Sequence, residues 1–137
     1  TQLNLNQYHG KIIPELCSYF NKSLDLYKSR VKQAQYLPKV ELLEEFRIKK
    51  YNVGGSDRFD EHVDVVDHKT SKRCLAMLFY LNSVTVGGHT KFPDQGDSIR
   101  PTKGHVVVFP PTWEYPHIGE PPISNPKYIM STYLHYQ

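Results

Sequence analysis

Two side chains that can bind a metal ion lie two residues apart in segment 59–66, which reads Phe-Asp-Glu-His-Val-Asp-Val-Val. Side chains of an extended strand alternate between its faces, so His62 and Asp64 would share one face, while Val63 and Val65 would form an apolar, buried one. An imidazole and a carboxylate side by side can occupy two adjacent corners of a metal's coordination shell. Among the seven histidines, only His62 begins a His-x-Asp or His-x-Glu triplet. Such a short pattern arises easily by chance, so taken alone it favours a surface strand with polar residues facing water.

A third metal ligand is offered by His117. An apolar strand, predicted over residues 104–109, runs into the aromatic segment 111–117, which ends at this histidine. Two histidines and one carboxylate on a β-scaffold form the facial triad of non-haem iron(II) oxygenases, which leaves coordination positions open. The alternative interpretation of His117 is a loop histidine whose ring is satisfied by backbone groups.

A lysine stands at the start of the last apolar segment. Lys127 follows His117 by ten residues and opens the aromatic and aliphatic run 127–135. Burying an ammonium group there is costly unless an anion accompanies it. A bound dicarboxylate would supply that anion, which weakens the loop interpretation of His117.

The elements that must hold these residues change in character along the chain. From about residue 10 to 35, apolar residues recur at the spacing of an amphipathic helix, with Pro14 in its first turn and Pro38 beyond its end. From Val40 onward the pattern predicts short strands at residues 42–51, 61–66, 74–82, 90–92, 104–109 and 128–135. We therefore expect a sandwich, barrel or jelly roll with one helix packed outside it.

Length and composition narrow the function classes. The 137 residues predict one domain, 1–137, with helical support over 1–38 and a β core over 40–137. A net charge of +3 without basic runs gives no reason to expect a nucleic-acid partner, and the apolar stretch 75–81 is too short for a membrane span.

Cys17 and Cys74 fit no CxxC pattern, so we expect a cytosolic, reducing location. The chain opens at Thr1 rather than Met and shows no signal peptide, and the sequence leaves open whether an N-terminal piece precedes it; no feature indicates an oligomeric state.

Several motifs together resemble a known family. The order His-x-Asp, distant His and Lys ten residues later is similar to the prolyl 4-hydroxylase-like branch of the 2-oxoglutarate oxygenases. Tyr80-Leu81-Asn82 followed by residues 87–93 resembles the "YLN…GGETxFP" segment of that branch, and residues 104–110 resemble its strand before the distal histidine. The resemblance runs from Tyr51 to His135. It implies a double-stranded β-helix, a jelly-roll or cupin-like fold, with a supporting N-terminal helix.

The resemblance also implies roles for individual residues. His62, Asp64 and His117 would bind iron(II), and Lys127 would pair with the distal carboxylate of 2-oxoglutarate. Hydroxyl partners of the same carboxylate would be Thr90, Tyr80 and Tyr51. O2 would be the second cosubstrate, and ascorbate is a candidate further cofactor.

A peptide or protein with a prolyl residue is the implied substrate. The substrate-binding residues carried over are Arg73, Tyr133, His135 and Phe59, where Phe59 replaces a usual tyrosine and Tyr133 a usual tryptophan. The alternatives are the same chemistry on a nucleobase, an amino acid or a small metabolite, and a non-catalytic cupin-like module that binds a metal or small anion. Lys127 and Thr90 favour the oxygenase, because a purely structural metal site needs neither.

Overall fold

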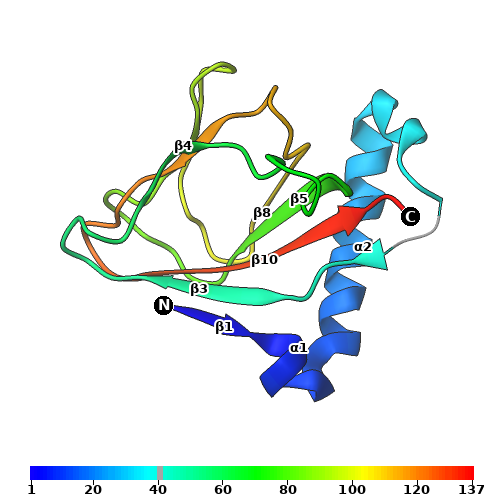
Figure 1. The fold of residues 1–137 in the computed structure, drawn as a ribbon. Coiled ribbons are helices and arrows are strands. Elements are labelled where there is room, and N and C mark those ends of the chain that lie inside the picture. Colours follow the sequence, from blue (N-terminus) through cyan, green and yellow to red (C-terminus); the bar gives the residue numbers. More distant parts are fainter. Residues whose placement is uncertain (40–41) are drawn as a thin grey trace.

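The chain folds into two antiparallel sheets in the computed structural model, which describes residues 1–39 and 42–137 (Figure 1). The larger sheet contains, in order, β1 (Gln2–Asn4), β3 (Arg47–Tyr51), β10 (Lys127–His135), β5 (Arg73–Tyr80) and β8 (Val106–Phe109), and β2 (Leu42–Leu43) pairs with β10. The smaller sheet contains, in order, β4 (Phe59–His62), β9 (His117–Gly119), β6 (Thr90–Phe92) and β7 (Asp97–Ile99). The predicted mainly β architecture with an N-terminal helix is confirmed.

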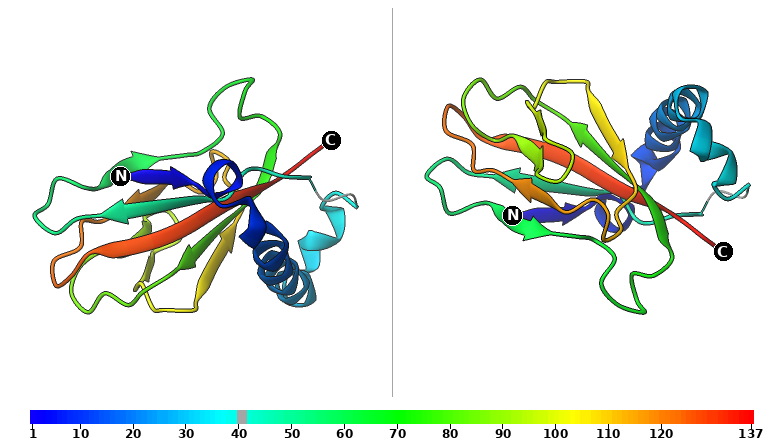
Figure 2. Two further views of the ribbon diagram at one scale, coloured as in Figure 1. Left: turned by 90° about the horizontal axis from the view of Figure 1, so that it is seen from below. Right: turned by 90° about the horizontal axis from the view of Figure 1, so that it is seen from above.

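The N-terminal helical region lies outside the larger sheet (Figure 2). It comprises α1 (Leu5–Tyr8) and α2 (Ile13–Arg30), with short 3₁₀ turns at Gly10–Ile12 and Lys32–Tyr36. The α-helix is therefore shorter than the predicted span 10–35, because Val31 adopts an extended backbone with φ −112° and ψ 104°. No helix in the described part of the chain is long and apolar enough to cross a bilayer.

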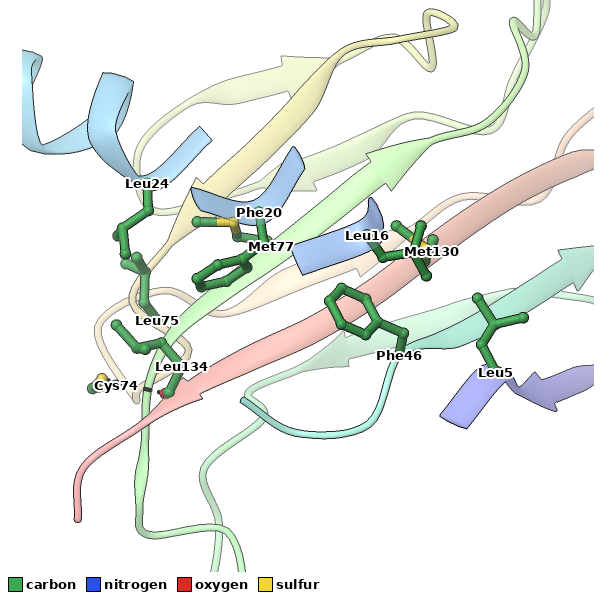
Figure 3. Packing of buried hydrophobic residues seen from close by; sticks show 10 residues of the cluster. All are labelled: Leu5, Leu16, Phe20, Leu24, Phe46, Cys74, Leu75, Met77, Met130 and Leu134. Carbon is green, nitrogen blue, oxygen red and sulfur yellow. Dashed lines mark hydrogen bonds between the residues drawn. The ribbon is translucent and has the colours of Figure 1, made fainter. Parts of the chain in front are cut away.

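The main hydrophobic core lies between α2 and the outer face of the larger sheet (Figure 3). Leu16, Phe20 and Leu24 on the helix pack with Met77 of β5 and Met130 of β10. Because side chains alternate along a strand, the residues between those core positions point the other way, toward the smaller sheet. Packing α2 on one face of the sheet thus determines which β10 residues face the interior between the sheets.

Aromatic side chains fill the space between the two sheets. Phe92 from the smaller sheet meets Phe109 from the larger one edge-on, with ring centroids 4.9 Å apart. Ala76 and Tyr133 pack in the same cluster. A neighbouring cluster consists of Tyr51, Tyr80 and Ile129. The polar side chains of the interior pack against these two clusters.

Two predicted strands differ from those observed. The strand expected over residues 42–51 is interrupted between β2 and β3, because Phe46 is buried and its N–H donates to the Asn6 side chain at 2.7 Å. The strand expected over 61–66 is β4, which begins at Phe59 and ends at His62. Residues 40 and 41, where the predicted β core begins, lie outside the described residues.

The remaining predicted strands agree with the observed ones to within two residues at each end. Short elements at Gln2–Asn4, Leu5–Tyr8, Asp97–Ile99 and His117–Gly119 were not predicted. Each has only three or four residues, too few to show a periodic pattern.

Leucines on opposite faces of α2 test the packing of the helix against the sheet. Leu24 is 0% exposed and Leu26 is 50% exposed. Leu24→Ala should lower the free energy of unfolding by about 2–5 kcal/mol, because it leaves a cavity in the core. Leu26→Ala should change it by less than about 0.5 kcal/mol. Urea unfolding of both variants measures the difference, and equal losses would contradict the assigned helix face.

Candidate metal centre

Three potential metal ligands converge between the sheets. One ligand atom from each of His62, Asp64 and His117 lies within 4.8 Å of the other two. The distances are 3.5 Å from His62 Nε2 to Asp64 Oδ1 and 3.6 Å from His117 Nε2 to Asp64 Oδ2. His62 and His117 are direct partners in the pairing of β4 with β9, and their ring centroids are 4.3 Å apart. Residues 55 positions apart in the chain therefore become cross-strand neighbours.

Backbone carbonyls orient both imidazole rings. His62 Nδ1 lies 2.8 Å from the carbonyl oxygen of Asp60, and His117 Nδ1 lies 3.1 Å from that of Tyr115. A carbonyl oxygen only accepts hydrogen bonds, so Nδ1 must carry the proton in both rings. Nε2 is then the ring atom of each histidine that can bind a metal, and in both rings it faces the Asp64 carboxylate. Such outer contacts fix the tautomer of a metal-binding histidine.

Asp64 is held in place by the loop after β4. The prediction that a single strand carries both His62 and Asp64 is wrong, because the backbone N–H groups of Asp64 and Val65 both donate to the Pro111 carbonyl, each at 3.1 Å. Arg73 Nη1 donates to the carbonyl oxygen of Asp64 at 3.0 Å. Val63 and Val65 are half-buried rather than buried. Hydrogen bonds to distant segments, and not strand alternation, aim this carboxylate.

The protonation states suit metal binding at neutral pH. Burial raises the pKa of Asp64, but the contacts with His62 and His117 outweigh it and leave that pKa below its usual value. The hydrogen bond to Asp64 raises the pKa of His62, whereas burial lowers the pKa of His117. Metal ligands must be deprotonated to bind. An ionised carboxylate beside a neutral His117 meets most of that requirement before a metal arrives.

Lys127 is buried in the same pocket. Its side chain is 2% exposed, its ammonium donates to the Gly88 carbonyl at 2.9 Å, and it lies 4.4 Å from the ring centroid of Tyr51. Burial lowers the pKa of Lys127 to about 8, and Glu120 offsets this only in part. Within residues 1–39 and 42–137, no carboxylate lies within ion-pair distance of the ammonium. A buried cation without an anion is the feature expected of an anion-binding pocket.

Hydroxyl groups stand beside Lys127. Tyr51 and Thr90 are buried and line the pocket that also contains the three potential metal ligands. Tyr80 does not line it, but its hydroxyl donates to Thr90 Oγ1 at 2.7 Å. Because Thr90 accepts that bond, its own O–H is free to donate elsewhere. Tyr80 thus acts on the pocket through Thr90.

The residues expected to contact substrate form a cluster at the edge of the site. Arg73 Nε and Nη2 donate to the two carboxylate oxygens of Glu44 at 2.6 and 3.1 Å. The Arg73 guanidinium also lies 4.1 Å from the ring centroid of Tyr133, and His135 Nε2 lies 2.9 Å from Glu44 Oε1. The sequence interpretation did not single out Glu44, which joins Arg73 to His135. Tyr133 reaches further inward and lines the pocket itself.

Phe59 and Lys49 complete the pocket wall. The Phe59 ring lies 5.4 Å from that of His62 and 6.0 Å from that of Tyr51, measured between centroids. Lys49 lines the same pocket and was missed by the sequence interpretation. The available signal was its position two residues before Tyr51, on the same face of β3.

The comparisons with known proteins agree with this geometry. The chain is 31% identical over 110 residues to the prolyl 4-hydroxylase subunit alpha-1 of Gallus gallus, a match covering 70% of this chain and 21% of that protein. The chain thus spans about a fifth of the length of this relative.

Two solved structures share the fold. The viral collagen prolyl hydroxylase vCPH from Paramecium Bursaria Chlorella virus-1 matches with a TM-score of 0.75 and 20% identity, covering 99% of this chain and 79% of that one. A prolyl-4-hydroxylase from Pseudomonas putida matches with a TM-score of 0.68 and 20% identity, covering 100% of this chain and 70% of that one. These likenesses confirm the predicted double-stranded β-helix.

The family model described as "2OG-Fe(II) oxygenase superfamily" matches residues 46–135, which include all three potential metal ligands and Lys127. That match spans more than half of the 137 residues. The chain therefore belongs to the 2OG-Fe(II) oxygenase superfamily.

Proposed function

We propose that this chain is a 2-oxoglutarate-dependent dioxygenase that hydroxylates prolyl residues of a peptide or protein, with release of succinate and CO2. The observation that carries the proposal is the buried ammonium of Lys127, which has no carboxylate partner in the described part of the chain and lies in the same pocket as His62, Asp64 and His117. A module that only binds a metal has no use for such a cation. A cosubstrate with two carboxylates would use both groups, because a metal held by the three ligands would bind one end and the Lys127 ammonium would bind the other.

In this proposal His62, Asp64 and His117 hold iron(II) from one side. The two Nε2 atoms that face the ionised Asp64 carboxylate support that role, and three protein ligands leave positions for other groups. Bound iron, 2-oxoglutarate and O2 would supply the oxidation chemistry, with ascorbate as a candidate accessory. The protein itself supplies orientation and exclusion of water. Phe92 and Phe109, whose rings lie 5.7 and 4.9 Å from that of His117, shield this ligand from solvent.

Lys127 and Thr90 bind the distal carboxylate of 2-oxoglutarate in this proposal. The ammonium supplies the charge, and the Thr90 O–H, left free by the bond from Tyr80, supplies a second donor. The ring of Tyr51 stabilises the ammonium through a cation–π contact. Fixing one end of the cosubstrate in this way orients its other end toward the metal.

A prolyl substrate is supported by the walls of the pocket and by the named relatives. Phe59 and Tyr133 offer aromatic faces on which a proline ring can pack, and the fixed φ of proline favours an extended peptide. A guanidinium has five N–H donors, of which Arg73 uses three in the described residues. The remaining two are available for peptide carbonyls. Arg73 would then serve both the peptide and the backbone of Asp64.

We also propose that residues 1–137 form one domain, since a single core cluster extends from Leu5 in α1 to Leu134 in β10. Cys17 and Cys74 are free thiols, which supports the proposed cytosolic, reducing location.

Metal binding is tested by removing its ligands. His62→Ala and Asp64→Ala should each weaken iron(II) binding by at least about a hundredfold, because loss of a ligand costs more than loss of an outer contact. Both should abolish 2-oxoglutarate decarboxylation while the circular dichroism spectrum is kept. Equilibrium dialysis under nitrogen measures the binding. His68→Ala, which removes an exposed histidine, is the control, and stoichiometric iron in either triad variant would refute the assignment.

The role of Lys127 is tested through the affinity for 2-oxoglutarate. Lys127→Ala should raise the dissociation constant by roughly a hundredfold or more, because it leaves a buried carboxylate unpaired. The wild-type affinity should also depend on pH. The free ammonium has a pKa of about 8 and a bound carboxylate would raise it, so affinity is full below pH 8 and is lost as pH rises through that value. The dissociation constant should rise about tenfold between roughly pH 7 and 9.

Lys127→Arg separates this effect from other titrations, because a guanidinium stays charged over the whole range. Calorimetric titrations of the two proteins at matched pH values provide the measurement. A pH profile that is the same in both proteins would show that Lys127 is not the group responsible.

The prolyl substrate is tested by mass spectrometry of proline-rich peptides incubated with the protein, iron(II), ascorbate and 2-oxoglutarate. We expect proline to gain one oxygen atom, with a Michaelis constant of about 1 mM, because Phe59 lacks a hydroxyl to donate to the peptide. Phe59→Tyr should lower that constant by about two- to tenfold, the value of one hydrogen bond. It should leave 2-oxoglutarate turnover without peptide unchanged. Oxygen gain by a nucleotide or free amino acid, and by no peptide, would refute the prolyl assignment.

A further inference from the structure

Lys49 presents a second cation to the pocket. It lies in the middle of β3, opposite Ile129 of β10 on one side and Gln2 of β1 on the other. Its side chain shares the inner face of β3 with Tyr51, while Ile48 packs on the core beneath α2. Two neighbouring strands therefore fix the backbone of Lys49, and its side chain leads toward the three potential metal ligands.

The ammonium of Lys49 has no acceptor among the described residues. It lies 5.1 Å from the ring centroid of Phe59, and no described residue forms a hydrogen bond or an ion pair with it. Burial lowers the pKa of Lys49, and the charge of Asp64 offsets this only in part. Most lysines near a surface turn their charge into water. The Lys49 side chain is half-buried against an aromatic wall of the pocket, where the anionic group of a ligand can contact its ammonium.

Lys49 and Lys127 stand at different places around the pocket. Lys127 lies over the ring of Tyr51, Tyr51 meets Phe59 edge-on, and Lys49 lies over the ring of Phe59. Lys49, Tyr51 and Phe59 also form the wall shared with a neighbouring surface pocket, whereas Lys127 lines only the inner one. Lys49 therefore lies nearer the surface of the molecule, whereas Lys127 is fully buried.

Charge balance separates the partner of Lys49 from the cosubstrate. Iron(II) and Lys127 together carry three positive charges, and Asp64 and the 2-oxoglutarate dianion together carry three negative charges, so that group is neutral. Lys49 adds one uncompensated positive charge. In the proposed function both ends of 2-oxoglutarate would already be bound, one by the metal and one by Lys127. A single anionic group on the substrate would compensate the remaining positive charge of Lys49.

We propose that Lys49 determines substrate specificity by pairing with a carboxylate, so that the preferred peptide carries Asp or Glu within two residues of the hydroxylated proline. This rests on the proposed prolyl hydroxylase function and names its substrate class. The peptide would lay the proline ring between Phe59 and Tyr133 and direct the acidic side chain toward β3. Lys49 would be a contact residue for substrate and would leave 2-oxoglutarate binding to Lys127.

The experiment compares peptides that differ only in the residue beside one proline, which is Asp, Asn or Lys. Wild-type protein should use the Asp peptide about ten- to hundredfold better than the Asn peptide in kcat/KM, with most of the difference in KM, because a charge-assisted hydrogen bond is lost. Lys49→Met should make the Asp and Asn peptides equal, and Lys49→Arg should keep the Asp preference. Lys49→Glu should favour the Lys peptide. Peptide binding to protein loaded with iron(II) and 2-oxoglutarate under nitrogen gives the same ranking without turnover.

Lys50→Met is the matched control. Lys50 is the next residue in β3, and its ammonium lies 5.8 Å from the ring centroid of Tyr128 on the opposite face. This variant should retain the wild-type preference for the Asp peptide. Equal use of the Asp and Asn peptides by wild-type protein would overturn the role of Lys49 and leave the prolyl hydroxylase function standing. Decarboxylation of 2-oxoglutarate without hydroxylation of any peptide would overturn both.

Discussion

The register of β10 is the constraint on which the rest of the molecule depends. Met130 and Leu134 point into the core beneath α2, and Lys127 and Tyr133 point into the pocket between the sheets. A shift of one residue in the pairing would exchange the two sets. It would place an ammonium group under the helix and leave the pocket without its charge. The hydrophobic contacts of α2 therefore also hold Lys127 in position.

The interruption between β2 and β3 connects the sheet to the loop that carries Asp64. Glu44 lies in that interruption, where its N–H donates to the Tyr133 carbonyl and its own carbonyl accepts from Thr132 Oγ1 at 2.7 Å. From there its carboxylate binds Arg73, which in turn binds the Asp64 carbonyl. This half-buried hydrogen-bonded network joins strand ends to one potential metal ligand, and linked hydrogen bonds of this kind polarise one another. A continuous strand over residues 42–51 would have pointed Glu44 elsewhere.

Buried charge is concentrated where ligands are expected to bind. Burial lowers the pKa of both Lys127 and Lys49, so each holds its charge at an energetic cost in the free protein. The surrounding aromatic rings of Tyr51 and Phe59 offset part of that cost through their negative faces. Retaining two such groups lowers stability in exchange for affinity, as is common in binding sites. Anions that bind the pocket would offset the cost of burying these two ammonium groups and would stabilise the fold by mass action.

The sequence by itself determined the chemistry of the site and the class of the fold. The triplet at His62, the later His117 and Lys127 could be selected from their residue types, their order and the resemblance of the surrounding motifs to a known family, and the helical stripe and short strands could be predicted because they are periodic. Only the tertiary structure decided how these residues meet. The pairing of β4 with β9 places His62 opposite His117. Hydrogen bonds to the Pro111 carbonyl and from Arg73 orient Asp64, and Lys49 lies on the face of β3 that lines the pocket. Each of these depends on hydrogen bonds or packing between segments far apart in the chain, and such contacts leave no pattern in the neighbouring residues.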